Sequence, residues 1–548
     1  MRPMRSLFRP RHPAEAAAPG STPPPSALAP LRLPVFRMLW GTWLVANVCM
    51  WMNDVAAAWM MTSLTTTPIW VALVQTAATL PVFLMGLPSG AMADILDRRR
   101  YFILTQFWVA GVALLMCVTI LAGWMSPTLL LLLTFANGIG LAMRWPVFAA
   151  IVPELVPRTQ LPAALALNGA AMNGSRIIGP LVAGALIASA GTLYVFLLNA
   201  ALSVIAGFII MRWRREHMPN PLGRERFFSA MRVGLQFVTH SARLRVVLLR
   251  IALFYSHCTA VLALLPLVAR GLPDGGAGTF TLLLAAMGLG AVLAVLFLPR
   301  LRQAMNLDQR VAFGTTLQAA SMAVMAFAPN VYVAVPTMFL GGVAWITVAN
   351  SLSVSAQMAL PNWVRARGMS LYQMALMGSG AIGAAVWGQV ATWSSVQTSL
   401  LVAAISAMLT LFLAHRYWAG HHEEQDLTPA SEYTQPVLST PPPSGHILVT
   451  IEYRIDPAQA EAFKAVLEDN RHSRLRRGAL HWELLRDLSQ PGVYVEHIVD
   501  ESWTDHLRRF ERMTADDVAL RERARAFHIG DATPVVKRFV IEGTVRHT

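Results

Sequence analysis

A short charged segment, residues 90–100, lies between two apolar runs at about 68–89 and 101–123. Each run is long enough to cross a bilayer as a helix, which rises about 1.5 Å per residue. A charged turn between two membrane spans must face water, and the three arginines at 98–100 place this turn on the cytoplasmic side. The sequence therefore predicts a chain built around a membrane.

The composition and charge agree with this prediction. The chain is 55% hydrophobic and only 14% charged, whereas soluble domains carry about a quarter charged residues. A net charge of +14 would indicate a nucleic-acid partner in a soluble protein. Residues 445–548, however, contain 16 basic and 17 acidic side chains, a net charge of −1, so the excess belongs to the membrane part. No nucleic-acid partner is expected.

The arginines of the membrane part cluster in alternate loops, and among the intervening loops only Arg270 appears. This positive-inside pattern predicts an even number of spans with both termini in the cytoplasm. We expect an all-α polytopic membrane protein with twelve transmembrane helices, because spans must satisfy their backbone internally. The spans are predicted at about 38–62, 68–92, 101–123, 127–150, 164–188, 192–212, 246–268, 277–298, 311–328, 331–354, 366–390 and 396–418.

A long basic loop divides the spans into two halves of six, and the second half repeats elements of the first. Gly179-Pro-Leu-Val-Ala-Gly184 in the first half has a counterpart in Gly383-Ala-Ala-Val-Trp-Gly388 of the second. The predicted parts are a disordered cytoplasmic leader (1–35), an N-terminal six-helix half (36–212), the basic loop (213–245), a C-terminal half (246–418), a polar linker (419–445) and a soluble tail domain (446–548). The segment Phe227 to His240 of the basic loop could lie as an amphipathic helix on the membrane surface.

The tail domain has alternating strand and helix patterns. Residues 447–455 indicate a strand, 457–477 a helix, 479–485 and 493–499 a strand pair, 503–527 a second helix and 535–541 a last strand. The order βαββαβ is the ferredoxin-like plan, a small α+β fold. In the linker, His421 and His422 could bind a metal, but a solvated pair is expected, and no cofactor is predicted.

Charged side chains in the middle of a span are costly, so each is a candidate for function. Asp54 lies about 24 Å and Arg176 about 18 Å from the cytoplasmic ends of their spans at 1.5 Å per residue. We expect them to pair or compete during proton coupling, or else to form a permanent structural ion pair. His257 has a pKa range suited to proton coupling, unless a backbone carbonyl satisfies it. Arg144 could contact an anionic substrate or lock against Asp94, or serve structure alone.

Two motifs resemble those of the major facilitator superfamily. The turn between the second and third spans contains Gly90, Asp94, Asp97, Arg98 and Arg99, and it resembles that superfamily's gating loop, with Ile95 and Asp97 as departures. In the fifth span, the motif of facilitator antiporters is similar to Ser175-Arg-Ile-Ile-Gly179-Pro180-Leu-Val-Ala-Gly184. The resemblance implies the major facilitator fold and export in exchange for protons; simple helix packing is the alternative.

The resemblance also implies which side chains line a central substrate cavity. In that superfamily spans 1, 4 and 10 line it, and here these spans carry Asn47, Trp51, Asn137, Arg144, Trp345 and Asn350. Aromatic rings beside amides suit planar or aromatic cargo. Trp51-Met-Asn-Asp54 and Pro153-Glu-Leu-Val-Pro157 resemble one bacterial branch, the transmembrane secretion effectors, which includes enterobactin-exporter-like and macrolide-efflux-like proteins. It implies an inner-membrane, proton-coupled exporter of a siderophore, drug or secondary metabolite.

The tail domain resembles the dimeric ferredoxin-like domains of antibiotic-biosynthesis monooxygenases, around Tyr494 to Leu507. His481, Trp482, His497, Trp503 and His506 could line a pocket for cofactor-free oxidation of an aromatic substrate. No nucleotide loop or nucleophile triad appears, and the same plan often serves only to pair subunits. We therefore expect a homodimerisation or regulatory module rather than an enzyme. The alternatives to an exporter are a proton-linked importer and a membrane-tethered monooxygenase.

Overall fold

The computed structural model describes residues 28–213, 227–273, 275–361, 363–418, 426, 428, 430, 445–530 and 532–542. The predicted leader, the linker histidines His421 and His422 and part of the basic loop lie outside the described residues. Six long helices form the N-terminal half: α1 (Pro34–Leu64), α2 (Pro68–Ile95), α3 (Arg98–Leu121), α4 (Pro127–Leu155), α5 (Leu161–Ser189) and α6 (Thr192–Met211). Three short 3-10 turns precede helices, η1 (Ala29–Arg32), η2 (Arg158–Gln160) and η3 (Pro457–Gln459).

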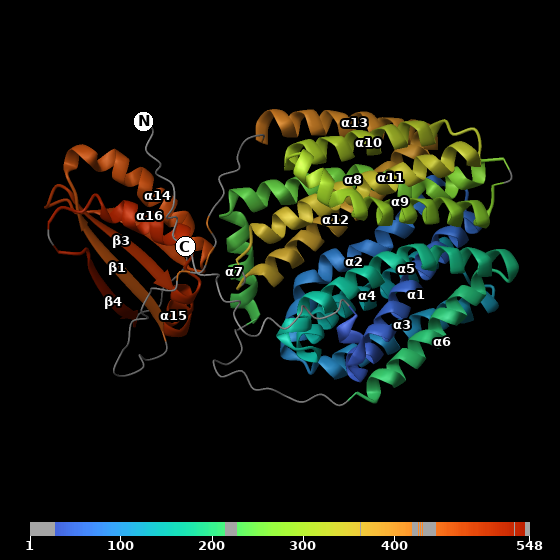
Figure 1. Cartoon of the computed structure of the whole chain (residues 1–548), viewed down its shortest axis with the longest axis horizontal. Helices are drawn as coiled ribbons and strands as arrows, with labels where there is room; N and C mark the ends of the chain where they lie inside the picture. The colour runs from blue at the N-terminus through green and yellow to red at the C-terminus, as the bar shows by residue number, and fades with distance from the viewer. Residues whose placement is uncertain are drawn as a thin grey trace, which may run out of the picture.

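A second set of six long helices follows the amphipathic helix α7 (Phe227–Thr239). They are α8 (Ala242–Gly271), α9 (Ala277–Ala304), α10 (Leu307–Ala326), α11 (Val331–Met358), α12 (Arg365–Trp393) and α13 (Val396–Trp418). Each half forms its own bundle, and the two bundles lie side by side (Figure 1).

Ten of these helices in the described chain are long and apolar enough to cross a membrane, and α1 and α10 are not among them. Both helices carry polar residues that lower their hydropathy: Asn47, Asn53 and Asp54 in α1, and Asp308 and Gln318 in α10. The chain is a multi-pass membrane protein, and ten spans follow from length and composition. The predicted count of twelve spans is reached only if α1 and α10, which lie within the bundles, also cross the membrane.

The halves meet where α2 packs on α12 and where α5 packs on α9. Two hydrogen bonds cross the α2–α12 contact: the Thr76 hydroxyl donates to the Ala381 carbonyl at 2.8 Å, and the Ile69 amide donates to the Thr392 hydroxyl at 3.0 Å. We call the end of the bundle where α8 and α12 begin, next to α7, the tail-side end. The opposite end, where α1, α8 and α12 finish, is the far end.

The tail domain is a four-stranded antiparallel sheet with helices on one face. Its strands are β1 (His446–Arg454), β2 (His481–Arg486), β3 (Val493–Asp500) and β4 (Val535–Ile541). They lie in the order β2-β3-β1-β4, all neighbours antiparallel. Helix α14 (Ala460–Arg476) connects β1 to β2, and α15 (Trp503–Glu511) and α16 (Ala515–Arg525) connect β3 to β4. This is the predicted βαββαβ order with its second helix divided.

The single helix predicted over residues 503–527 is wrong, because a new helix begins after Thr514. The Thr514 hydroxyl accepts from the Asp517 amide at 3.4 Å, and the Asp517 carboxylate accepts from the Thr514 amide at 3.0 Å. This reciprocal capping box satisfies donors at the start of α16. The chain turns at Met513 instead of continuing α15.

The tail domain contacts the membrane part through α7 and through Trp363, which precedes α12. Arg232 on α7 forms an ion pair of 2.6 Å with Glu501, and Gln236 donates to the Ala479 carbonyl at 3.2 Å. The Arg512 guanidinium lies 4.7 Å from the ring centroid of Trp363, just before α12. In Figure 1, α7 stands between the tail domain and the helical bundles.

Candidate functional site between the two halves

Arg176 on α5 lies where the two halves meet. Its guanidinium carbon is 5.4 Å from the ring centroid of Trp51 on α1 and 4.0 Å from that of Trp345 on α11. Its Nε is shielded and has no hydrogen-bond partner within the described chain. Aromatic faces attract a cation electrostatically, so two rings, one from each half, take the place of a carboxylate partner.

Asp54 does not pair with Arg176. Its carboxylate forms neither an ion pair nor a hydrogen bond with any described residue, and Arg176 contacts the two tryptophans instead. Asp54 lies on α1 three residues after Trp51, a spacing that places both on one side of the helix. The permanent ion pair considered from the sequence is therefore absent in this conformation, and Asp54 stays an unpaired acid near the ring that Arg176 contacts.

The antiporter-like motif places α5 against one helix of each half. At Gly179 a Cβ atom would lie 2.4 Å from Trp51 Cβ, so only glycine allows α5 this close to α1. At Gly184 a Cβ atom would lie 2.2 Å from Thr281 Oγ1 on α9, in the other half. Ser175 donates to the Met172 carbonyl within α5, and Pro180 lies inside the helix.

His257 lies away from the contact between the halves. Its Nδ1 is 2.6 Å from the Leu253 carbonyl oxygen, which is a hydrogen bond within α8. It lines a cavity of about 30 Å³ among α8, α10 and α13, together with Arg250. The backbone-satisfied histidine, the alternative given above, is the arrangement that the structure contains.

The other predicted cavity residues make their contacts within their own halves. Arg144 is buried, its guanidinium carbon 5.7 Å from the ring centroid of Trp43, so it does not extend to water. Asn47 donates to the Trp43 carbonyl at 2.7 Å. Asn47 and Asn137 are buried, and the side-chain oxygen of each lacks a hydrogen-bond partner in the described chain. Asn350 accepts a hydrogen bond from Arg302 of α9.

The predicted gating loop is held to the N-terminal half. Asp97 caps α3 by accepting from the Arg100 amide at 2.9 Å. Arg98 forms an ion pair of 2.6 Å with Glu154 at the end of α4, and Arg99 donates to the Met211 carbonyl of α6. Gly90 and Asp94 belong to the last turns of α2; the Asp94 side chain lies outside the described part of the chain.

A contact at the far end was not predicted. The Arg270 guanidinium at the end of α8 donates to the Thr62 carbonyl of α1 and lies 5.2 Å from the ring centroid of Trp59. The Trp59 ring stacks on Phe280 of α9 at 6.1 Å. We call these residues the far-end latch, because they join the two halves. The sequence held a signal for it, since Arg270 is the lone arginine in the loops between the arginine-rich ones.

Of the five residues proposed for a tail pocket, Trp503 and His506 lie together, with ring centroids 5.2 Å apart, but the five do not form one pocket. The Trp482 indole donates to Glu496 at 2.8 Å, while His481 contacts Glu483 at the edge strand. Only His506 of the five lines the tail cavity. Within the described residues, no group of three or more His, Cys, Asp or Glu side chains could hold a metal ion.

The sequence pattern of the transmembrane secretion effector family matches residues 25–545. The chain belongs to this family. The match runs through the tail domain as well as both six-helix halves. No curated protein matches the chain.

Solved structures similar to this secretion effector are membrane transporters. They include the nucleoside transporter NupG (TM-score 0.57, 14% identity, 70% of this chain and 99% of that chain) and a POT family transporter in complex with 5-aminolevulinic acid (0.56, 13%, 69% and 95%). A third is a bacterial homologue of the human lysosomal transporter Spinster in an inward-facing state (0.53, 15%, 71% and 97%). At these identities the likeness concerns the fold, which is that of the major facilitator superfamily. The family and the fold together make this effector a secondary transporter.

Proposed function

We propose that this transporter exports a small organic molecule from the cytoplasm in exchange for protons, by alternating access between its two halves. The observation that carries the proposal is the contact of Arg176 with Trp51 and Trp345. It places a cation and two aromatic rings from both halves around one point inside the membrane. A planar or anionic cargo could replace either ring over the guanidinium, and so separate the halves as it binds.

Proton coupling is assigned to Asp54 with Arg176 as its counterpart. An ionised carboxylate without a partner is unfavourable inside a membrane, so protonation and deprotonation there carry a large change in free energy. Asp54 lies one helical turn from Trp51, and Trp51 contacts Arg176. Loss of the proton would draw Arg176 away from Trp345 and toward Asp54, which weakens the contact between the halves.

The far-end latch supports alternating access because it joins the two halves at one end of the bundle. Arg270, Trp59 and Phe280 come from both halves; Arg270 is held by a hydrogen bond and a ring face, and Trp59 stacks on Phe280, which is buried in the core. In the proposed cycle the latch is closed while the transporter is open toward the cytoplasm. It opens when the cargo leaves.

The orientation follows from the arginines. The alternate loops that carry them face the cytoplasm, so we infer twelve spans in the bacterial inner membrane with both termini and the tail domain inside. The tail domain is then a regulatory or dimerisation module that contacts α7 and Trp363. An importer would share every one of these features except direction, and the family match favours export.

Proton flux in everted membrane vesicles tests this proposal. A pH-sensitive dye reports the gradient while catechol siderophores, macrolides and planar aromatic dyes are added in turn. Wild type should collapse the gradient with at least one compound. Asp54→Asn should not, and Asp54→Glu, which keeps an acid at the position, should retain part of the flux. Equal flux in wild type and Asp54→Asn would remove Asp54 from the coupling mechanism.

A further inference from the structure

The tail domain encloses a cavity of about 60 Å³ between its sheet and its helices. Side chains from β1, β3 and β4 form one wall, and side chains from α14, α15 and α16 form the other. A water molecule needs about 10–15 Å³ measured in this way, so the cavity holds on the order of five non-hydrogen atoms. The proposed transport cycle makes no use of it.

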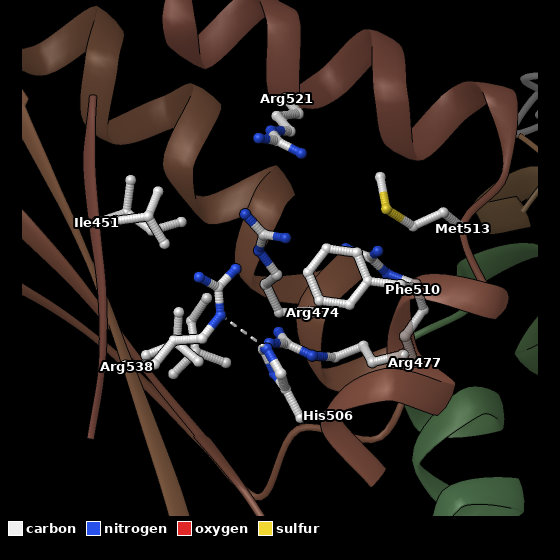
Figure 2. A pocket seen from close by; sticks show the side chains of 12 residues that line it. Ile451, Arg474, Arg477, His506, Phe510, Met513, Arg521 and Arg538 are labelled. Atoms are coloured by element: carbon white, nitrogen blue, oxygen red, sulfur yellow. Dashed lines mark hydrogen bonds between the residues drawn. The ribbon is translucent and has the colours of Figure 1, made fainter. Parts of the chain in front are cut away.

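The lining of this cavity is strongly cationic. Among the described residues it contains five arginines and no carboxylate; the arginines are Arg474, Arg477, Arg509, Arg521 and Arg538. They come from α14, α15, α16 and β4, and Figure 2 shows the guanidinium groups of Arg474, Arg521 and Arg538 around one space. Carboxylates behind the lining offset part of this charge: Arg474 pairs with Glu496 at 3.1 Å, Arg477 lies 3.8 Å from Asp517, and Arg509 pairs with Asp500 at 2.9 Å.

His506 adds no charge to the lining. Its Nδ1 lies 2.7 Å from Asp500 Oδ2, and its Nε2 accepts from Arg538 Nε at 3.1 Å (Figure 2). A ring that donates through Nδ1 and accepts through Nε2 is neutral. Burial first, then the nearby Arg509 and Arg538, lower the pKa of His506 against the raising effect of Asp500. At neutral pH the charge of the lining is therefore that of its arginines.

Arg509 gives a second indication that a ligand binds here, because two of its nitrogen atoms have no hydrogen-bond partner in the described chain. Its side chain is only 5% exposed, and its Nη2 bonds Asp500 Oδ2 at 2.9 Å. Nε and Nη1 are shielded from solvent and have no hydrogen-bond partner in the described chain. Buried donors of this kind are almost always satisfied in folded proteins, by protein, water or ligand. Arg509 lines the cavity, which is where a partner would lie.

The remaining lining decides what kind of anion fits. Its other members are apolar side chains: Val449, Ile451, Ile498, Phe510, Met513 and Val536. A fully polar anion such as phosphate would leave its oxygens against this wall. A carboxylate matches the planar fork of a guanidinium, and a short apolar body matches the wall.

We propose that the tail cavity is a binding site for a small organic carboxylate. The carboxylate group is held by Arg509 together with Arg474 and Arg521 of the neighbouring helices, and its apolar body rests on Ile451, Ile498 and Phe510. The proposal concerns the tail domain alone and does not depend on the direction or coupling of transport.

Isothermal titration calorimetry of the full chain in detergent, with isobutyrate as the ligand, tests the site. Isobutyramide, the neutral isostere, and inorganic phosphate serve as comparison ligands. We expect one isobutyrate to bind per chain. Isobutyramide and phosphate should each bind at least tenfold more weakly. The site is overturned if isobutyrate does not bind at tens of millimolar, and the carboxylate assignment is overturned if phosphate binds more tightly.

Variants locate the binding. Arg509→Gln should weaken the binding of isobutyrate at least tenfold. Arg508→Gln changes a neighbour whose guanidinium bonds Asp505 and does not line the cavity, so it should bind like wild type. Since Arg509→Gln leaves Asp500 with one partner fewer, Arg521→Gln, on the neighbouring helix α16, provides a second variant with an expected loss of threefold or more. Unchanged binding in both Arg509→Gln and Arg521→Gln would contradict the proposed site.

Discussion

The guanidinium carbon of Arg176 lies 4.0 Å from the ring centroid of Trp345, so a charge from α5 of the first half rests on an aromatic ring from α11 of the second. A cation over an indole is stabilised by about 0.5–1 kcal/mol at an exposed site and by about 2 kcal/mol when water is excluded. This contact is a direct link between the halves at the level where cargo and protons are proposed to act.

Replacing the Trp345 ring should loosen that link. Trp345→Leu is expected to cost about 1–2 kcal/mol of the contact, which favours separated halves roughly 5- to 30-fold. Spin-label distances between α5 and α11 in detergent measure the change. Trp345→Phe keeps an aromatic face and should fall between wild type and Trp345→Leu. Identical distance distributions in all three proteins would show that the contact does not hold the halves together.

Asp517 should be the residue on which the tail fold depends most. Its side chain is 1% exposed and lies 3.1 Å from Arg476, 3.8 Å from Arg477 and 2.5 Å from the Ser473 hydroxyl. Asp517→Asn leaves buried arginines without their counter-ion, so we expect the tail to lose about 3–5 kcal/mol of unfolding free energy. Asp516→Asn, whose side chain is 28% exposed and 3.8 Å from Arg476, should cost under about 1 kcal/mol.

Urea titration of the full chain, with hydrogen exchange of α14 and α16 as readout, measures both variants. Equal losses for the two substitutions would contradict a special role for Asp517.

Low pH should lower the stability of the tail domain through Asp517. Burial raises the pKa of Asp517, but Arg477, Arg476 and the Ser473 hydroxyl more than offset this and lower it to about 2. The unfolded value is about 3.9, so the stabilisation is complete above about pH 4 and is lost as the pH falls toward 2. It amounts to roughly 2–3 kcal/mol. Thermal unfolding between pH 6 and pH 2 should show this decline in wild type and little of it in Asp517→Asn. Parallel curves would contradict the assignment.

The contact between the tail and α7 should also depend on pH, in a higher range. His240 and His472 face each other with their Nδ1 atoms 3.2 Å apart. Burial, then His472, Arg471 and Arg245, lower the pKa of His240, while Glu468 lies 3.8 Å from His472 on its other side. A lowered pKa means that the docked state favours neutral His240. Docking is therefore strongest above about pH 6.5 and weakens as the pH falls below it.

Hydrogen exchange of α7 at pH 7.5 and pH 5.5, corrected for intrinsic rates, should reveal faster opening at the lower pH. His472→Gln cannot gain a proton and should flatten this dependence. An unchanged pH dependence in His472→Gln would exclude the histidine pair as its source.

Hydropathy and arginine distribution predicted the long helices well, because bilayer thickness and backbone hydrogen bonding leave few choices. They could not predict that Arg176 contacts Trp345 rather than Asp54. That contact joins residues 169 positions apart, and it depends on how α5 and α11 are rotated, which hydropathy does not determine. For the tail, alternation predicted the strands. The break at Thr514 was missed although Thr514 and Asp517 have capping-box spacing, a signal that was present in the sequence.

The most direct test of the account is whether the two ends of the bundle open in opposition. In a background without Cys49, Cys117 and Cys258, Thr281→Cys reports the far end, where Thr281 is buried against Gly184. Met374→Cys reports the tail-side end, where Met374 faces Gly86. Arg270→Gln removes the far-end latch, and Arg302→Gln is the matched control, because Arg302 bonds Asn350 within one half.

Labelling with a membrane-impermeant maleimide is then compared between the two reporters. Arg270→Gln should raise labelling at Thr281→Cys and lower it at Met374→Cys, while Arg302→Gln should leave both unchanged. A rise at both ends, or no change at either, would contradict alternating access governed by Arg270.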